Sequence, residues 1–466
     1  MPPSNFYEYQ LAGLAGICLL SLLAERRISG QKPKHDKEER LENGKHNTTP
    51  GSAVSALARQ YLIVYAIVMG ADWLQGPYVY SLYREQYTFP ERTVALLFVT
   101  GFISAGLTAP LTGVWADQYG RRRLCLYFCL SYTLACVCIL FPWLPILLMG
   151  RVLGGISTSI LFSAFESWLI SSANNLALPQ ADLSSILGRA TLINGFVAAG
   201  SGVFSNQLVT VTSTFASPFV ASGILLVLSW FAIRASWSEN YGSGGGATND
   251  DFFQLKRIGH AWRIVRSDSR LLVVGLTQTC FEGSMYLFVF LWVPSLQEVA
   301  SSTPGASLPL GYIFSSFMFS MMIGSVLYTA ITSYALPPTS SAPSSGKGDP
   351  SVIVHAMLSS AVCAVSAFSL AVSVKANTEH VRFWAFCVFE ACVGMYYPVQ
   401  GMLRGALIAN EHRATLSSLF RVPLNIFVVV SLLTGVSSAR RAVLTACSLM
   451  LSFSSVMVAA VIANSG

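Results

Sequence analysis

Apolar segments long enough to cross a lipid bilayer recur along the whole chain. A helix needs about 20 mostly apolar residues to cross the hydrocarbon core, and such segments alternate with short polar ones from Phe6 to Ala463. Of the 466 residues, 53% are hydrophobic and only 11% are charged, whereas a typical soluble domain has roughly 25% charged residues. The chain has too little polar surface to cover itself in water, so the sequence predicts an all-α membrane protein.

The apolar segments predict one isolated helix followed by two sets of six. The first segment lacks the basic start and the cleavage site of a signal peptide, so we expect it to be retained. The predicted divisions are an N-terminal transmembrane helix at 1–24, a cytoplasmic polar linker at 25–58, a six-helix bundle at 59–236, a cytoplasmic central loop at 237–269 and a second six-helix bundle at 270–466. The expected spans of the two bundles are 59–84, 92–116, 124–143, 146–170, 188–211, 218–234, 271–296, 308–335, 351–374, 381–402, 416–436 and 442–463.

Lys and Arg in the short loops predict the orientation of the chain, because cytoplasmic loops carry an excess of them. The basic segments are the linker, "DQYGRRR", the central loop and "LRGALIANEHRA". We therefore expect the N-terminus outside the cytoplasm and the C-terminus inside it. The pair Arg440 and Arg441 is an exception, because it falls on the opposite side.

A glycine- and arginine-rich motif, "GVWADQYGRRR", follows the second span of the first bundle. Gly113 allows helices to approach closely, Gly120 permits a tight turn, and Asp117 can cap the next helix or pair with a basic side chain. The pattern resembles the loop signature of the major facilitator superfamily. The resemblance implies the major facilitator fold, with Gly113, Asp117, Gly120 and Arg121 as a gating motif that stabilises the outward-open state. The alternative is an ordinary basic loop.

A second pattern, "GRVLGG", begins at Gly150 and resembles the arginine-containing pattern that many major facilitators carry in this span. The alternative is that Arg151 extends its charged end to the membrane interface. The loop after Ala335 has no copy of the first motif, so the gate is expected to be asymmetric. Pro77, Pro398 and Pro423 are expected to interrupt their helices.

Ionisable side chains also fall inside the predicted spans, where each costs roughly 2.5–3.5 kcal/mol on insertion scales. Helical spacing places Asp72 with Gln75, Glu282 with Gln278, and Arg421 with Asn425 on polar stripes. Such groups usually face a cavity or each other. The predicted substrate and ion pathway consists of Asp72, Gln75, Tyr78, Arg151, Glu166, Gln278, Glu282, Glu390, Arg421 and Asn425. The alternative is a set of structural salt bridges between helices.

Several longer stretches carry a narrower resemblance. "ADWLQGPYVYSLY", "GRVLGGISTSILFSAFESWLI", "FEGSMYLFVFLWVPSL", "GYIFSSFMFSMMIGS" and "FRVPLNIF" resemble the eukaryotic molybdate-anion transporter family of the major facilitator superfamily, over essentially all the predicted spans. The resemblance implies high-affinity molybdate uptake by alternating access across the plasma membrane. It also implies a monomer in the lipid bilayer that holds no cofactor.

The polar side chains inside the predicted spans support an anion as the substrate only in part. Molybdate is a tetrahedral dianion, which arginine, amide and hydroxyl donors can bind, but the spans also carry four acids. A protonated carboxyl group can donate a hydrogen bond to an anion, so coupling to protons is a hypothesis that reconciles the two. Another major facilitator cargo, such as a sugar or an organic ion, is an alternative, and so is a membrane sensor or scaffold that does not transport.

Other classes of function find no support in the sequence. It contains no P-loop, nucleophile elbow or HExxH pattern, so we do not expect an enzyme. The ten cysteines lack metal-site spacing, so no metal is expected. The net charge of +7 comes from basic residues clustered in loops, which gives no indication of nucleic-acid binding.

Overall fold

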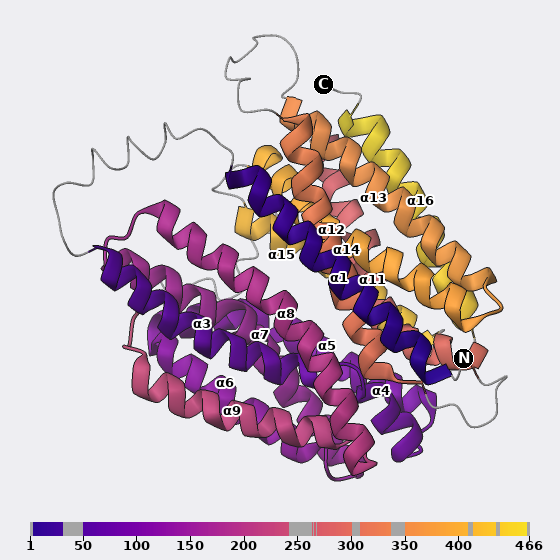
Figure 1. The fold of residues 1–466 in the computed structure, drawn as a ribbon, viewed down its shortest axis with the longest axis horizontal. Helices are drawn as coiled ribbons and strands as arrows, with labels where there is room; N and C mark the ends of the chain where they lie inside the picture. Colours follow the sequence, from indigo (N-terminus) through magenta and orange to yellow (C-terminus); the bar gives the residue numbers. More distant parts are fainter. Residues whose placement is uncertain are drawn as a thin grey trace. The chain divides into compact units, whose positions relative to one another are not determined.

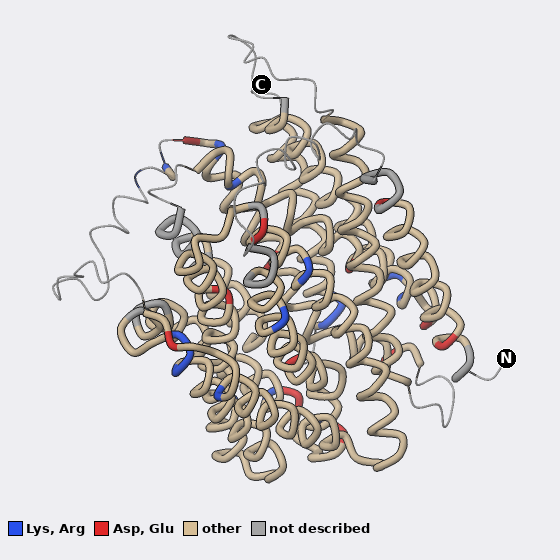
Figure 2. The backbone as a smooth tube through the Cα atoms, turned by 60° about the vertical axis from the view of Figure 1, so that its left-hand side comes forward, with Lys and Arg blue, Asp and Glu red and all other residues tan. Residues whose placement is uncertain are grey.

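The computed structural model of the chain consists of long helices. It describes residues 3–30, 50–241, 263, 265–266, 268–300, 308–336, 350–408, 413–434 and 439–463. No strand occurs within these ranges, and charged residues are sparse along the described backbone (Figure 2). The predicted all-α class is therefore confirmed.

The helices group into two compact units, named here by the half of the chain that supplies most of each. The N-unit comprises Leu23–Ala247 with Leu310–Ser315, and the C-unit comprises Met1–Leu22, Thr248–Pro309 and Ser316–Gly466. The N-unit contains α3 (Pro50–Gln75), α4 (Val79–Ser81), η1 (Leu82–Gln86), α5 (Glu91–Tyr119), α6 (Arg121–Cys138), α7 (Leu144–Asn175), α8 (Gln180–Thr212) and α9 (Ser217–Ser236). The C-unit contains α11 (Ser269–Ala300), α13 (Pro350–Lys375), α14 (Glu379–Leu407), α15 (Arg413–Thr434), α16 (Arg440–Val458) and η2 (Ala459–Ala463), while α1 (Pro3–Gly30) and α12 (Leu310–Ala335) have residues in both units.

Ten helices of the described ranges are long and apolar enough to cross a membrane. Three predicted spans, at 124–143, 381–402 and 416–436, correspond to α6, α14 and α15, which are not among those ten. Three arginines start α6, and α14 carries two acids and two arginines. Charged residues lower the apolar content of α6 and α14, and the described part of α15 contains a shorter apolar helix, Pro423–Thr434. The layout of twelve spans plus one therefore stays a prediction.

In the N-unit, α7 packs against α5 and α6, and α3 packs against α8 and α9 (Figure 1). The segment after α9 closes one end of the core of this unit. Trp237 stacks on Trp168 of α7 with 3.7 Å between ring centroids, and the Trp168 indole nitrogen donates to the Ser238 carbonyl at 2.9 Å. Both tryptophans are almost fully buried, so these contacts fix the segment to α7.

In the C-unit, α11 packs against α14, α15 and α16, and α13 packs against α14 and α16. Gly394 lets α14 approach α12 backbone to backbone, because a Cβ atom at this position would overlap the Met321 carbonyl.

The predicted interruption at Pro398 is wrong, since Pro398 lies inside a continuous α14. The carbonyl four residues before a proline loses its helical N–H partner. Here that carbonyl belongs to Gly394, and the Ser325 hydroxyl donates to it at 3.0 Å.

Of the other two prolines, one follows the end of a helix and one lies inside a helix. Helix α3 ends at Gln75, two residues before Pro77, as expected from the sequence. Pro423 lies inside α15, so the interruption predicted there is also wrong.

We predict that Gly394→Ala lowers the stability of the protein by roughly 1–3 kcal/mol, the usual cost of overpacking, because the added methyl group meets the Met321 carbonyl. Gly401→Ala on the same helix is the matched control, since no atom lies within 4 Å of its Cβ position. The measurement is the midpoint of thermal unfolding in detergent. Equal midpoints for the two variants would contradict the close approach of the helices.

Candidate functional site

The glycine-arginine motif forms the turn between α5 and α6. Gly120 has a φ of 101°, a conformation that glycine adopts at little cost. The start of α6 is capped by Glu239, whose carboxylate accepts hydrogen bonds from the backbone N–H of Arg122 at 2.9 Å and of Arg123 at 3.1 Å. A carboxylate at a helix N-terminus is stabilising because it satisfies free N–H groups and the helix dipole.

Sequence reasoning assigned this capping role to Asp117 as one of two options. The structure places Glu239 at the cap, more than a hundred residues along the chain, and the side chain of Asp117 lies outside the described part. The gating role of Gly113, Asp117, Gly120 and Arg121 stays a prediction.

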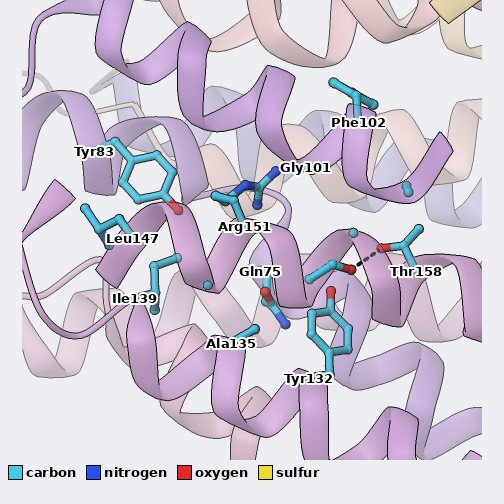
Figure 3. Close-up of a pocket in the computed structure, with 14 residues that line it drawn as sticks. Gln75, Tyr83, Gly101, Phe102, Tyr132, Ala135, Ile139, Leu147, Arg151 and Thr158 are labelled. Atoms are coloured by element: carbon cyan, nitrogen blue, oxygen red, sulfur yellow. Dashed lines mark hydrogen bonds between the residues drawn. The ribbon is translucent and has the colours of Figure 1, made fainter. Parts of the chain in front are cut away.

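A cavity of about 130 Å³ lies inside the N-unit (Figure 3). Its lining residues come from α3, η1, α5, α6 and α7, together with Ile139 after α6. Two residues of the predicted pathway, Gln75 and Arg151, line this cavity. Glycines of α5 and α7 form part of its wall and leave room beside the polar side chains.

Arg151 supplies the charge of the cavity. Its Nε donates to the Leu97 carbonyl at 3.1 Å, and its guanidinium carbon lies 5.3 Å from the centroid of the Phe98 ring. Gly101 allows this approach, since a Cβ atom there would lie 2.9 Å from a guanidinium nitrogen. Within the described ranges no carboxylate lies within the 4.0 Å of an ion pair with Arg151. Four of its five N–H donors thus remain for other acceptors.

Neutral donors surround the guanidinium. The Tyr83 hydroxyl faces the same cavity and is buried, and it has no hydrogen-bond partner among the described residues (Figure 3). The Gln75 amide nitrogen donates to the Ser222 hydroxyl at 2.8 Å. The Tyr132 hydroxyl donates to the Asp72 carboxylate at 2.7 Å. Asp72 is not itself a lining residue, so its charge is separated from the cavity by the Tyr132 phenol.

A second polar cluster lies in the C-unit. The Gln278 amide nitrogen donates to Glu282 Oε2 at 3.3 Å, and the Tyr396 hydroxyl donates to Glu282 Oε1 at 3.3 Å. Arg404 Nη1 donates to the side-chain oxygen of Gln278, Oε1, at 3.4 Å. Gln278, Glu282 and Tyr396 are buried, and Arg404 is half-buried. The predicted stripe of Gln278 and Glu282 is thus a hydrogen-bonded chain.

The remaining residues of the predicted pathway join neither group. Tyr78 is buried in the N-unit, where its hydroxyl donates to Asn206 at 2.9 Å. Glu166 is exposed on α7. Glu390 is 6% exposed, and none of the hydrogen bonds described above includes it. Asn425 is half-buried on α15, and the side chain of Arg421 lies outside the described part.

The predicted pathway did not include four residues of these groups: Tyr83, Tyr132, Tyr396 and Arg404. Arg404 was assigned to a cytoplasmic loop, but it lies in the last turn of α14. Helical spacing contained the signal, since positions 396, 400 and 404 share one face. The tyrosines gave none, because their aromatic rings match the surrounding apolar runs.

The cavity presents one cation and neutral donors, a set that binds anions with several oxygens. Among the described residues no cluster of His, Cys, Asp and Glu could hold a metal ion. The geometry therefore favours a small oxygen-rich anion over a metal cation.

Comparisons with known proteins agree with a transporter. Residues 38–340 match the family model described as sugar transporters with 12 transmembrane segments. The molybdate-anion transporter of Xenopus tropicalis is 36% identical over 381 residues, which cover 79% of this chain and 76% of that protein. The molybdate-anion transporter of Xenopus laevis is 34% identical, and the match covers 90% of this chain and 87% of that protein. The molybdate-anion transporter of Danio rerio is 30% identical, and the match covers 90% of this chain and 85% of that protein.

Solved structures show the same fold at low sequence identity. A mutant of the nucleoside transporter NupG superposes with a TM-score of 0.65 at 9% identity, covering 88% of this chain and 99% of that one. The POT family transporter PepTSo superposes with a TM-score of 0.64 at 11% identity, covering 88% of this chain and 98% of that one. These relatives and neighbours are transporters and not enzymes.

We predict that Glu239→Ala lowers the thermal stability of the protein by about 1 kcal/mol, a typical cost of losing a helix cap, because the first N–H groups of α6 lose their acceptor. Glu8→Ala, at an exposed position, is the control. Thermal unfolding of the purified protein measures both. A Glu239→Ala midpoint no lower than that of the control would show that the carboxylate does not cap α6.

Proposed function

We propose that this chain, which belongs to the molybdate-anion transporter family of the major facilitator superfamily, carries molybdate across a membrane. Its multi-pass helical fold and its relatives make it a membrane transporter. The observation that supports an anion as cargo is Arg151, a guanidinium inside the N-unit with no carboxylate partner among the described residues. The names of the relatives point to molybdate in particular.

The size of the cavity fits this cargo. A buried cavity of about 150 Å³ is enough to bind benzene, which has six heavy atoms. The cavity here has about 130 Å³, and molybdate has five heavy atoms. Arg151 and Tyr83 offer a guanidinium and a hydroxyl. Together they can donate to several oxygens of one tetrahedral ion.

The transport cycle that we propose is alternating access, driven by protons and directed into the cell across the plasma membrane by a monomer. The buried carboxyl group of Glu282 supports proton coupling. Its carboxylate accepts hydrogen bonds from the Gln278 amide and the Tyr396 hydroxyl, which places an acid that can carry a proton inside the C-unit. Asp72, held by the Tyr132 hydroxyl, is the corresponding group of the N-unit.

A sugar is the second candidate cargo, because the matching family model is described as one of sugar transporters. Aromatic and amide side chains suit sugars as well as oxyanions. Competition against labelled molybdate uptake separates the two. We expect tungstate, also a tetrahedral dianion, to compete strongly, sulfate less strongly, and hexoses and amines not at all. Displacement of molybdate by a hexose, or no molybdate uptake, would contradict the proposal.

We predict that Arg151→Gln reduces molybdate uptake by about tenfold or more, because a hydrogen bond to a charged group contributes roughly 1.5–3 kcal/mol. Arg151→Lys should retain part of the uptake, since the charge remains but the planar fork is lost. Accumulation in a transport-deficient host, normalised to protein delivered to the membrane, measures the effect.

The control is Arg84→Gln, which changes an exposed arginine of the same unit that donates to the Phe89 carbonyl at 3.1 Å. Its uptake should match the unmodified protein. Full uptake by a well-delivered Arg151→Gln protein would remove Arg151 from the substrate site.

A further inference from the structure

One of the glycines that line the N-unit cavity has open space beside it. The lining glycines are Gly101, Gly150, Gly154 and Gly155. At Gly101 a Cβ atom would lie 2.9 Å from an Arg151 nitrogen. At Gly150 it would lie 2.8 Å from a side chain of α6, and at Gly155 it would lie 2.5 Å from the Gly101 carbonyl. At Gly154, by contrast, no atom of the described residues outside the local backbone lies within 4 Å of the Cβ position. Helix packing therefore requires a glycine at the other three positions but not at 154.

The space beside Gly154 belongs to the cavity. An α-helix has 3.6 residues per turn, so position 154 falls between 150 and 158 around the axis of α7. Gly150 and Thr158 both line the cavity, and a side chain at position 154 would therefore point into it. Arg151 lies on the same face of the helix, about one turn before Gly154.

The backbone of Gly154 contributes room to the cavity and not a hydrogen bond. The Thr158 hydroxyl donates to the Gly154 carbonyl at 2.9 Å (Figure 3). This bond uses the only hydroxyl proton of Thr158. The α7 wall next to Arg151 therefore offers an ion space and van der Waals contact.

The donors of the cavity do not by themselves distinguish one tetrahedral dianion from another. The Arg151 guanidinium can donate to any of them, and so can the buried Tyr83 hydroxyl, which has no hydrogen-bond partner among the described residues. Molybdate, tungstate and sulfate have the same charge, the same shape and four oxygens each. They differ in size, because the metal–oxygen bonds of the first two are longer than the sulfur–oxygen bonds of sulfate. Selection among them therefore depends on the room that the cavity leaves.

We propose that Gly154 is a specificity-determining residue, and that the space beside it makes the cavity prefer large tetrahedral oxyanions to sulfate. The inference rests on the proposed function, since it assumes that this cavity holds the transported anion. A large ion can bind Arg151 and contact α7 at Gly154 at the same time. A smaller ion bound to Arg151 leaves a gap beside Gly154, and a gap too small for water loses the contacts across it.

The variant that tests this is Gly154→Ala, which places one methyl group in a cavity of about 130 Å³. One methylene group more or less in a binding pocket changes discrimination by roughly 10–200-fold. We expect the affinities for molybdate and tungstate to fall about tenfold, while the affinity for sulfate stays the same or rises. Gly154→Val, with a larger side chain, should weaken molybdate binding further. Alanine favours the helix more than glycine does, so Gly154→Ala should unfold at a temperature no lower than the unmodified protein.

The measurement is titration calorimetry of the purified full-length protein. Molybdate and tungstate are titrated directly, and the molybdate titration is repeated in the presence of sulfate to obtain the sulfate affinity. The deciding quantity is the ratio of the sulfate Kd to the molybdate Kd, which does not depend on the fraction of protein that is active. Gly188→Ala on α8 is the matched control. No described atom outside the local backbone lies within 4 Å of its Cβ position, and Gly188 is not a lining residue. Its ratio should match the unmodified protein.

The outcomes separate the two proposals. If the unmodified protein binds no molybdate, the proposed function fails and this inference fails with it. If it binds molybdate but Gly154→Ala keeps the same ratio, or weakens all three ions equally, the inference fails and the proposed function stands. An unmodified protein that binds sulfate as tightly as molybdate would also overturn the inference.

Discussion

The account of the N-unit depends on Arg151, a guanidinium held among apolar helices with no carboxylate partner in the described part of the chain. An arginine at membrane depth costs roughly 2.5–3.5 kcal/mol even on the lower scales. Here a carbonyl of α5, the face of the Phe98 ring and the bare backbone at Gly101 accommodate Arg151. These contacts offset part of the cost but leave the charge uncompensated within the described residues. A bound anion would compensate it.

In each unit a tyrosine hydroxyl donates a hydrogen bond to a carboxylate. In the N-unit the Tyr132 hydroxyl donates to Asp72, and in the C-unit the Tyr396 hydroxyl donates to Glu282. In each unit the acid comes from the first long helix of a bundle, α3 or α11, and the arginine from α7 or α14. In the N-unit the acid and the arginine do not pair directly, so the guanidinium of Arg151 can bind an anion.

Much of the architecture could be predicted from the sequence, because the apolar segments are long and the bilayer sets their length. Gln75 and Arg151 could also be selected as candidates, since polar groups inside a span usually face a cavity or each other, and both line the N-unit cavity. Long-range contacts could not be predicted. Nothing near Gly120 indicates that Glu239 caps α6, and nothing near Pro398 indicates that Ser325 satisfies the freed carbonyl. Such partners are brought together only by the packing of helices distant in sequence.

The central claim is that the cavity beside Arg151 holds the transported ion. Anomalous diffraction from crystals of the protein soaked in tungstate, collected at a tungsten absorption edge, tests it most directly. We predict an anomalous peak within the N-unit cavity, at hydrogen-bond distance from the Arg151 guanidinium and next to the Tyr83 hydroxyl and the Gln75 amide. An occupied tungstate site elsewhere in the protein, with this cavity empty, would contradict the claim.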